Sequence, residues 1–136
     1  MEKLTILIVA PIDQRYVAKL NADPRIAKAQ QLPQDLWHIF EDMCNRDVEA
    51  AAEDPGPLAP YFAEADVIVC WHLPHGFAIW APRLKWVQVW GSGTDVIRPS
   101  GLFEAGIPVT NLAGVHAIPI AEHVLMLMLM LARDSK

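Results

Sequence analysis

The stretch VTNLAGVHAIPIAEHVLMLMLMLAR, residues 109–133, is the most informative part of this 136-residue chain. It reads as a short strand, a loop and a helix, an arrangement that normally joins two domains. Pro119 suits the first turn of a helix, Glu122 lies near the positive end of the helix dipole and Arg133 near the negative end. We therefore expect a helix over residues 118–133, give or take two residues. Because residues 124–132 are apolar nearly all round, this helix must pack against something on more than one side.

The composition bounds the class of protein. The chain is 53% hydrophobic and 20% charged, which is typical of one globular domain with enough apolar material for a core. Its formal net charge is -5 and no Lys/Arg cluster occurs, so we expect no nucleic-acid partner. Cys44 and Cys70 lie far apart without metal-ligand spacing, and Cys70 ends an apolar run, which together fit a reducing cytoplasm.

Neither a secretion signal nor a membrane span is expected. The apolar run at residues 4–10 is short and no small-residue cleavage site follows it. The helix near the carboxyl end carries Glu122 and His123 in its first half. Too few uninterrupted apolar residues follow them to cross a hydrocarbon core of ~30 Å.

Four short apolar runs predict buried strands, at residues 4–10, 67–71, 86–90 and 109–111. The first three are apolar almost throughout instead of alternating with polar residues. Such strands are usually covered on both faces, as in a parallel sheet with crossover helices. The sequence therefore predicts an α/β fold with a doubly wound parallel sheet of about five strands and a long C-terminal helix.

The remaining segments are harder to assign. Residues 15–20 and 58–65 are expected to be helical, and either 26–32 or 36–40 should hold another strand. Residues 48–53 lead into a break at residues 54–57, Asp-Pro-Gly-Pro. Residues 77–84 form a short segment before the next strand, and residues 100–105 a helical turn closed by Gly106.

The loop at residues 90–96, WGSGTDV, follows a predicted strand and begins like the dinucleotide fingerprint Gly-x-Gly-x-x-Gly. Val96 occupies the third glycine position, where the fingerprint needs close packing of helix on strand. The loop can also be a plain tight turn. We favour a third interpretation, in which the backbone N–H groups of Ser92 and Gly93 form a concavity that binds a small carboxylate beyond the strand end.

Two stretches, residues 84–95 and residues 106–122, resemble the D-isomer-specific 2-hydroxyacid dehydrogenases. The match is to the substrate-binding domain of these enzymes. Trp71-His72-Leu73-Pro74, after the middle strand, is most similar to the glyoxylate and hydroxypyruvate reductase branch. The resemblance is specific over residues 66–133. The first sixty residues match only in having an initial strand and the right length.

The resemblance implies a flavodoxin-like substrate domain over residues 1–116 and an interdomain and dimerisation helix over residues 117–136. By this resemblance the main-chain amides of Ser92 and Gly93 bind the substrate carboxylate, and the loop of Leu73 and Pro74 forms a wall of the site. Ile118 and Ile120 lie in the turn that faces the nicotinamide side of the cleft.

The family's NAD- or NADP-binding Rossmann domain and its catalytic arginine, histidine and carboxylate come from later sequence. We therefore expect no catalytic residue in this chain, no cofactor bound by it alone and no activity without the rest of the enzyme. The full-length enzyme would use NAD or NADP to reduce a small 2-oxo acid. The alternative is a non-catalytic carboxylate-binding or dimerisation module derived from such a dehydrogenase.

Histidines suggest a metal site only weakly. His72 and His75 lie three residues apart in a Pro-containing loop, which lacks the helical geometry that would point both rings at one ion. His116 and His123 have no partner carboxylate at a defined spacing, so we assign them structural roles and predict no metal. A receiver-type signalling domain is disfavoured, because the first strand is followed by a lone Asp13 and the strand ending at Cys70 by Trp-His in place of Asp.

The alternating Leu and Met residues 125–131 are interpreted as an interface, since methionine adapts to irregular contact surfaces. In the family this helix contributes to the dimer contact and the domain junction. We therefore expect the isolated domain to form a homodimer through residues 118–133, with exchange of the helix between protomers as one route.

Overall fold

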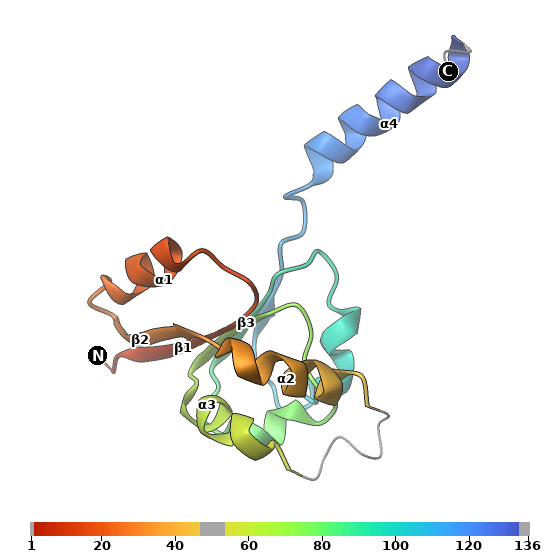
Figure 1. Cartoon of the computed structure of the whole chain (residues 1–136). Coiled ribbons are helices and arrows are strands. Elements are labelled where there is room, and N and C mark those ends of the chain that lie inside the picture. Colours follow the sequence, from red (N-terminus) through yellow and green to blue (C-terminus); the bar gives the residue numbers. More distant parts are fainter. Residues whose placement is uncertain (1, 47–53, 134–136) are drawn as a thin grey trace.

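A computed structural model describes residues 2–46 and 54–133 and shows an α/β domain from which one long helix projects (Figure 1). The strands are β1 (Leu4–Val9), β2 (Ile26–Gln31), β3 (Val67–Cys70), β4 (Trp86–Val89) and β5 (Val109–Thr110). The α-helices are α1 (Gln14–Asn21), α2 (Trp37–Cys44), α3 (Ala59–Glu64) and α4 (Ala117–Ala132). Short 3-10 helices lie at Gln34–Leu36, Gly56–Leu58, Phe77–Trp80 and Asp95–Ser100.

The five strands form one sheet in the order β2-β1-β3-β4-β5, and every pair is parallel. This is the flavodoxin-like order of a doubly wound sheet, so the predicted fold class is confirmed. The register brings Ile6 opposite Val67, Val67 opposite Trp86, and Val87 opposite Val109. The carboxyl ends of β1, β3 and β4 consequently meet at one edge of the sheet.

The structure resolves one alternative and corrects one expectation. Residues 26–31 form the edge strand β2, whereas residues 36–40 belong to the 3-10 and α-helical segment that ends at Cys44. The helical segment expected over residues 100–105 lies earlier, at Asp95–Ser100, and is followed by turns up to Gly106, whose φ is 68°. The prediction for residues 48–53 lies outside the described residues.

Helices cover the two faces of the sheet unequally. One face packs against α2, α3 and the segment Phe77–Trp80, through a cluster that includes Phe40, Phe62 and Phe77. The rings of Phe62 and Phe77 meet edge to face with centroids 4.9 Å apart. The other face packs against α1 through Val17 and neighbouring residues of β1, β2 and β3. As Figure 1 shows, α1 lies over the β2–β1 side of the sheet.

The helix α4 confirms the bounds expected from the sequence to within one residue, but all of its residues are exposed. It extends away from the sheet as an arm (Figure 1). Its foot is fixed by two hydrogen bonds, from the Leu112 amide to the Gly91 carbonyl (2.9 Å) and from the Asn111 side-chain amide to the Ser92 carbonyl (2.8 Å). No helix of the described residues is long and apolar enough to span a bilayer.

A buried carboxylate, that of Asp66, connects several segments at the edge of the sheet where the strands begin. This edge is opposite the one that carries the loop at residues 90–96. Asp66 is fully buried at the start of β3, where it accepts a hydrogen bond from the Thr5 amide (2.9 Å). Arg83 Nη2 and Lys85 Nζ lie 3.2 and 3.1 Å from its oxygens. Burial alone would raise the pKa of Asp66, but the hydrogen bonds and the two cations outweigh it and hold the pKa below its ordinary value.

We predict that Asp66→Asn lowers the free energy of unfolding by about 2 kcal/mol at neutral pH, because the amide leaves two cations without their anion. The folded-state pKa of Asp66 is depressed, so its stabilisation is present above the unfolded pKa of about 3.9 and is lost as the pH falls through the folded value. Urea titrations should therefore show the difference from wild type at pH 7 shrinking in acid. The exposed carboxyl control Glu104→Gln should change little at either pH; an equal loss from both variants would contradict the assignment.

Candidate functional site

The carboxyl ends of β3 and β4 form a small pocket. It has a volume of about 290 Å³ and is lined by Trp71, His72, Gly91, Gly93, Asp95 and Val96. The indoles of Trp71 and Trp90 stack beside it, with centroids 6.2 Å apart and an angle of 9° between the rings. The Trp90 amide donates to the Cys70 carbonyl (2.7 Å), which continues the pairing of the two strands to the pocket.

The glycine loop presents backbone donors. Its carbonyls are used to hold the foot of α4, since those of Gly91 and Ser92 accept from Leu112 and Asn111. Within the described part of the chain, the amides of Ser92 and Gly93 donate to no protein acceptor. Neighbouring N–H groups of this kind can bind an anion at a strand end. Gly93 lines the pocket and Ser92 does not, and binding of a carboxylate by the two amides stays a prediction.

The same loop does not fit a dinucleotide pyrophosphate. It leads into the 3-10 helix Asp95–Ser100, which contains Pro99, instead of an α-helix whose N-terminus would face the phosphates. Val96, at the position of the third glycine, is 58% exposed and packs no helix onto the strand. The dinucleotide alternative for this loop is thus wrong for this chain.

Leu73 and Pro74 are buried, and Leu73 belongs to the core cluster on the α2 and α3 face. The residues of this loop that line the pocket are Trp71 and His72, which sequence reasoning did not assign to the site. Their position directly after an apolar strand was the available signal. The role of Leu73 and Pro74 as a substrate wall stays a prediction.

His72 connects the pocket to α2. Its Nε2 lies 3.3 Å from Oε2 of Glu41, and its ring stacks on Phe40 with centroids 5.8 Å apart. Glu41 is therefore placed to pair with a protonated His72. Among the described residues, no three His, Cys, Asp or Glu side chains come together in a group that could hold a metal ion.

The charge at the pocket is negative. Asp95 lines it, and a Cβ atom added to Gly93 would lie 3.8 Å from Asp95 Oδ2. None of the residues that line the pocket is a lysine or an arginine. Binding of an anion must therefore depend on backbone dipoles and work against this carboxylate.

Ile118 and Ile120 lie in the first turns of α4 and are 73% and 60% exposed. The linker of residues 111–116 separates them from the pocket, and they line none of the cavities described here. Their cofactor-facing role is an expectation from the resemblance.

Comparison with known proteins shows that this chain shares its fold with solved structures. No protein-family model and no curated protein matches the chain. Among solved structures, a 2-hydroxyacid dehydrogenase from Ketogulonicigenium vulgare Y25 matches with a TM-score of 0.63 at 20% identity, over 96% of this chain and 36% of that one. An NAD-dependent formate dehydrogenase from Staphylococcus aureus, in complex with NAD, matches with a TM-score of 0.61 at 19% identity, over 96% and 39%.

A third match is an NADPH-dependent glyoxylate/hydroxypyruvate reductase from Sinorhizobium meliloti in complex with NADP and malonate. Its TM-score is 0.57 at 21% identity, over 95% of this chain and 34% of that one. The chain thus spans little more than a third of the length of these structures. The resemblance to the 2-hydroxyacid dehydrogenases is confirmed at the level of the fold.

The stacked indoles at the pocket predict a measurable coupling. A double-mutant cycle of Trp71→Leu and Trp90→Leu should give a coupling of about 0.5–1.5 kcal/mol in the free energy of unfolding, the range for aromatic pairs. Denaturant titration measures it. The matched cycle of Trp71→Leu with Trp86→Leu should give none, because the Trp86 indole bonds to Thr110 instead; equal coupling in both cycles would show that the ring contact is not its source.

Proposed function

We propose that this chain is the substrate-binding portion of an NAD(P)-dependent oxidoreductase that reduces 2-oxo acids to D-2-hydroxy acids, with glyoxylate or hydroxypyruvate as the substrate type. The observation that carries the proposal is the pair of amides at Ser92 and Gly93, which donate to no acceptor within residues 2–46 and 54–133. They lie at the carboxyl end of β4, in a fold shared with a reductase solved with malonate. Ligands of open α/β sheets bind at this edge.

The pocket suits a small carboxylate. Its volume of about 290 Å³ lies at the lower limit for ligand sites and favours an acid of few heavy atoms. In the proposed arrangement the amides of Ser92 and Gly93 hold the carboxylate, and Trp71 shields one side from water. Leu73 and Pro74 support the wall from below, while Ile118 and Ile120 face the nicotinamide.

In this proposal the residues described at the pocket do not bind the cofactor. The loop at residues 90–96 does not fit a pyrophosphate, so NAD or NADP would be held by a Rossmann domain that residues 117–136 join to the substrate domain of residues 1–116. The nicotinamide supplies the hydride when it is bound. None of the residues described at the pocket is assigned a catalytic role, and we infer that the chain by itself is inactive.

The alternative proposal is a non-catalytic module that binds a small carboxylate or forms dimers. It is favoured by the exposed apolar surface of α4 and by the acidic Asp95 in the pocket. For either function we propose a cytoplasmic location, because both cysteines are free.

Ligand titration tests the proposal. Glyoxylate, hydroxypyruvate or oxalate, added at millimolar concentration to the purified chain, should shift the amide NMR signals of Ser92 and Gly93. Signals of Thr5 and Asp66 at the opposite edge of the sheet should not move. Absence of any shift at Ser92 and Gly93 would refute the carboxylate site.

A charge variant sharpens this test. Asp95→Asn removes the negative charge at the pocket and should tighten oxalate binding about threefold at low salt, with a smaller gain at high salt. Glu104→Gln removes the same charge from an exposed position that does not line the pocket and should have no effect. Weaker binding by Asp95→Asn would mean that Asp95 orders the loop instead of repelling the anion.

A further inference from the structure

The pocket at the ends of β3 and β4 has no permanently positive side chain to hold an anion. The residues that line it are Trp71, His72, Gly91, Gly93, Asp95 and Val96. While His72 is neutral, backbone dipoles alone attract an anion there, and the carboxylate of Asp95 repels it. A hydrogen bond from a charged donor holds a carboxylate about twice as strongly as one from a neutral donor. Among these lining residues, His72 is the one whose side chain can become positively charged.

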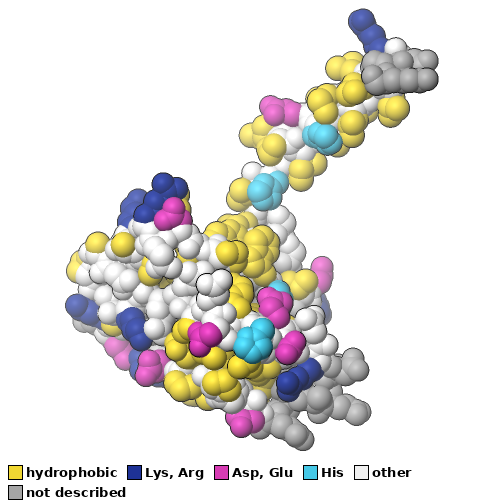
Figure 2. Space-filling view, viewed as in Figure 1, with side chains coloured by type: hydrophobic (Ala, Val, Ile, Leu, Met, Phe, Trp, Pro, Cys, Tyr) yellow, Lys and Arg dark blue, Asp and Glu magenta, His cyan; other side chains and the backbone are white. Residues whose placement is uncertain are grey.

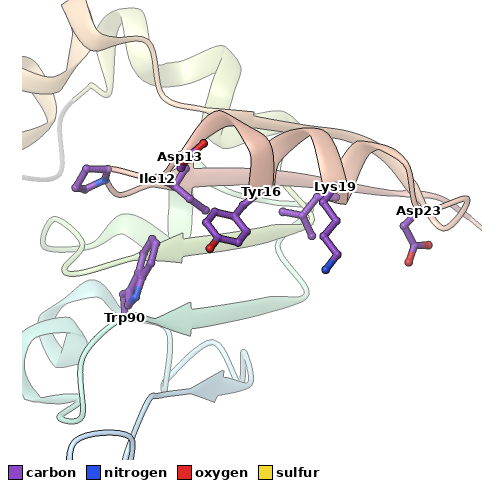
Figure 3. Close-up of a pocket in the computed structure, with 8 residues that line it drawn as sticks. Ile12, Asp13, Tyr16, Lys19, Asp23 and Trp90 are labelled. Atoms are coloured by element: carbon purple, nitrogen blue, oxygen red, sulfur yellow. The ribbon is translucent and has the colours of Figure 1, made fainter.

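A larger cavity nearby does not supply the missing charge. It has a volume of about 730 Å³, and its walls include Tyr16, Lys19 and Trp90. Figure 3 shows Tyr16 and Trp90 on opposite sides of this space. The Trp90 indole stacks on that of Trp71, which lines the pocket, so the indole pair lies between the pocket and the larger cavity. Lys19 lines the cavity and not the pocket, which leaves His72 as the source of positive charge.

Helix α2 holds His72 from outside the pocket. The Nε2 atom of His72 lies 3.3 Å from Oε2 of Glu41, and its ring stacks on Phe40 with an angle of 27° between the rings. Figure 2 shows acidic side chains and a histidine together over α2. Phe40 is buried, and neither Phe40 nor Glu41 lines the pocket. The imidazole therefore forms part of the wall, fixed by α2 on one side and in contact with the pocket on the other.

The position of Glu41 decides which ring nitrogen is available to a ligand. A lone pair on Nε2 would point toward a carboxylate oxygen, so the proton of the neutral ring belongs on Nε2. Within the described residues, Nδ1 has no hydrogen-bond partner. A second proton there gives an imidazolium with a free N–H donor. The charged groups that face the ring are Glu41 from α2 and Asp95 from the 3-10 helix, and residues 91–94 of the glycine loop carry no charge.

We propose that protonated His72 supplies the positive charge that binds the substrate carboxylate, with Glu41 as its counter-ion outside the pocket and Phe40 as the support of its ring. This inference rests on the proposed carboxylate site and adds the residue that gives the site its charge. His72 is a binding residue here: it takes its proton from solvent and transfers none to the substrate. Since the anion and the proton bind together, affinity rises as the pH falls through the range in which histidine gains its charge.

Oxalate titrations of the purified chain test the proposal, with the amide NMR signal of Gly93 as the probe. Oxalate stays ionised at both pH values, and wild type should bind it about tenfold more tightly at about pH 6 than at about pH 8. His72→Gln keeps a polar side chain without the charge and should bind at both pH values as weakly as wild type does in the more alkaline buffer. His72→Lys, charged throughout, should bind tightly at both. The control His75→Gln, partly buried in the same loop but not lining the pocket, should behave as wild type.

The imidazole signal of His72 gives an independent readout. Saturating oxalate should move the titration midpoint of His72 to higher pH and leave that of His116, on the exposed linker, unmoved. Circular dichroism verifies that each variant is folded. Equal affinity of wild type at the two pH values, or wild-type affinity of His72→Gln in the acidic buffer, would overturn the role of His72 and leave the carboxylate site standing. Absence of a Gly93 shift in every variant at both pH values would overturn both.

Discussion

The need to cover both faces of a parallel sheet determines most of this structure. The inner strands β1, β3 and β4 are paired on both sides within the sheet, but the apolar side chains on each face need a second layer. The face toward α2 and α3 has one, built around Phe40, Phe62 and Phe77. The opposite face is covered by α1 over β1 and β2, while Val69, Gln88 and Trp90 on the same face are only partly buried.

The site follows from the same parallel arrangement. Strands β3 and β4 end side by side, so Trp71, Gly91 and Gly93, which follow these strands, line one small pocket. In this loop the carbonyls of Gly91 and Ser92 hold the foot of α4, while the amides of Ser92 and Gly93 donate to no acceptor among the described residues, which is the basis of the proposed anion site. The hydrogen bonds of Leu112 and Asn111 thereby connect the foot of α4 to the loop beside the pocket.

The sequence alone predicted those elements whose signal lies in residues close together along the chain. Continuous apolar runs predicted β1, β3 and β4, and Pro119 with Arg133 placed α4 to within one residue. The edge strand β2 was ambiguous because its residues Lys28, Gln30 and Gln31 are polar, as an edge allows. The ion cluster of Asp66 and the pairing of His72 with Glu41 join residues that are distant in sequence, so no local pattern could reveal them. Burial of Leu73 in the core cluster likewise depends on how the loop after β3 turns.

Amide hydrogen exchange as a function of protein concentration tests the central claim most directly. If α4 forms the predicted dimer contact, peptides that contain α4 should gain protection as the concentration rises through the micromolar range, and Tyr16 on the other exposed apolar surface serves as a comparison. Peptides from α2 and α3, which lie on the covered face, should be unchanged. Protection of α4 that does not vary with concentration would contradict the account.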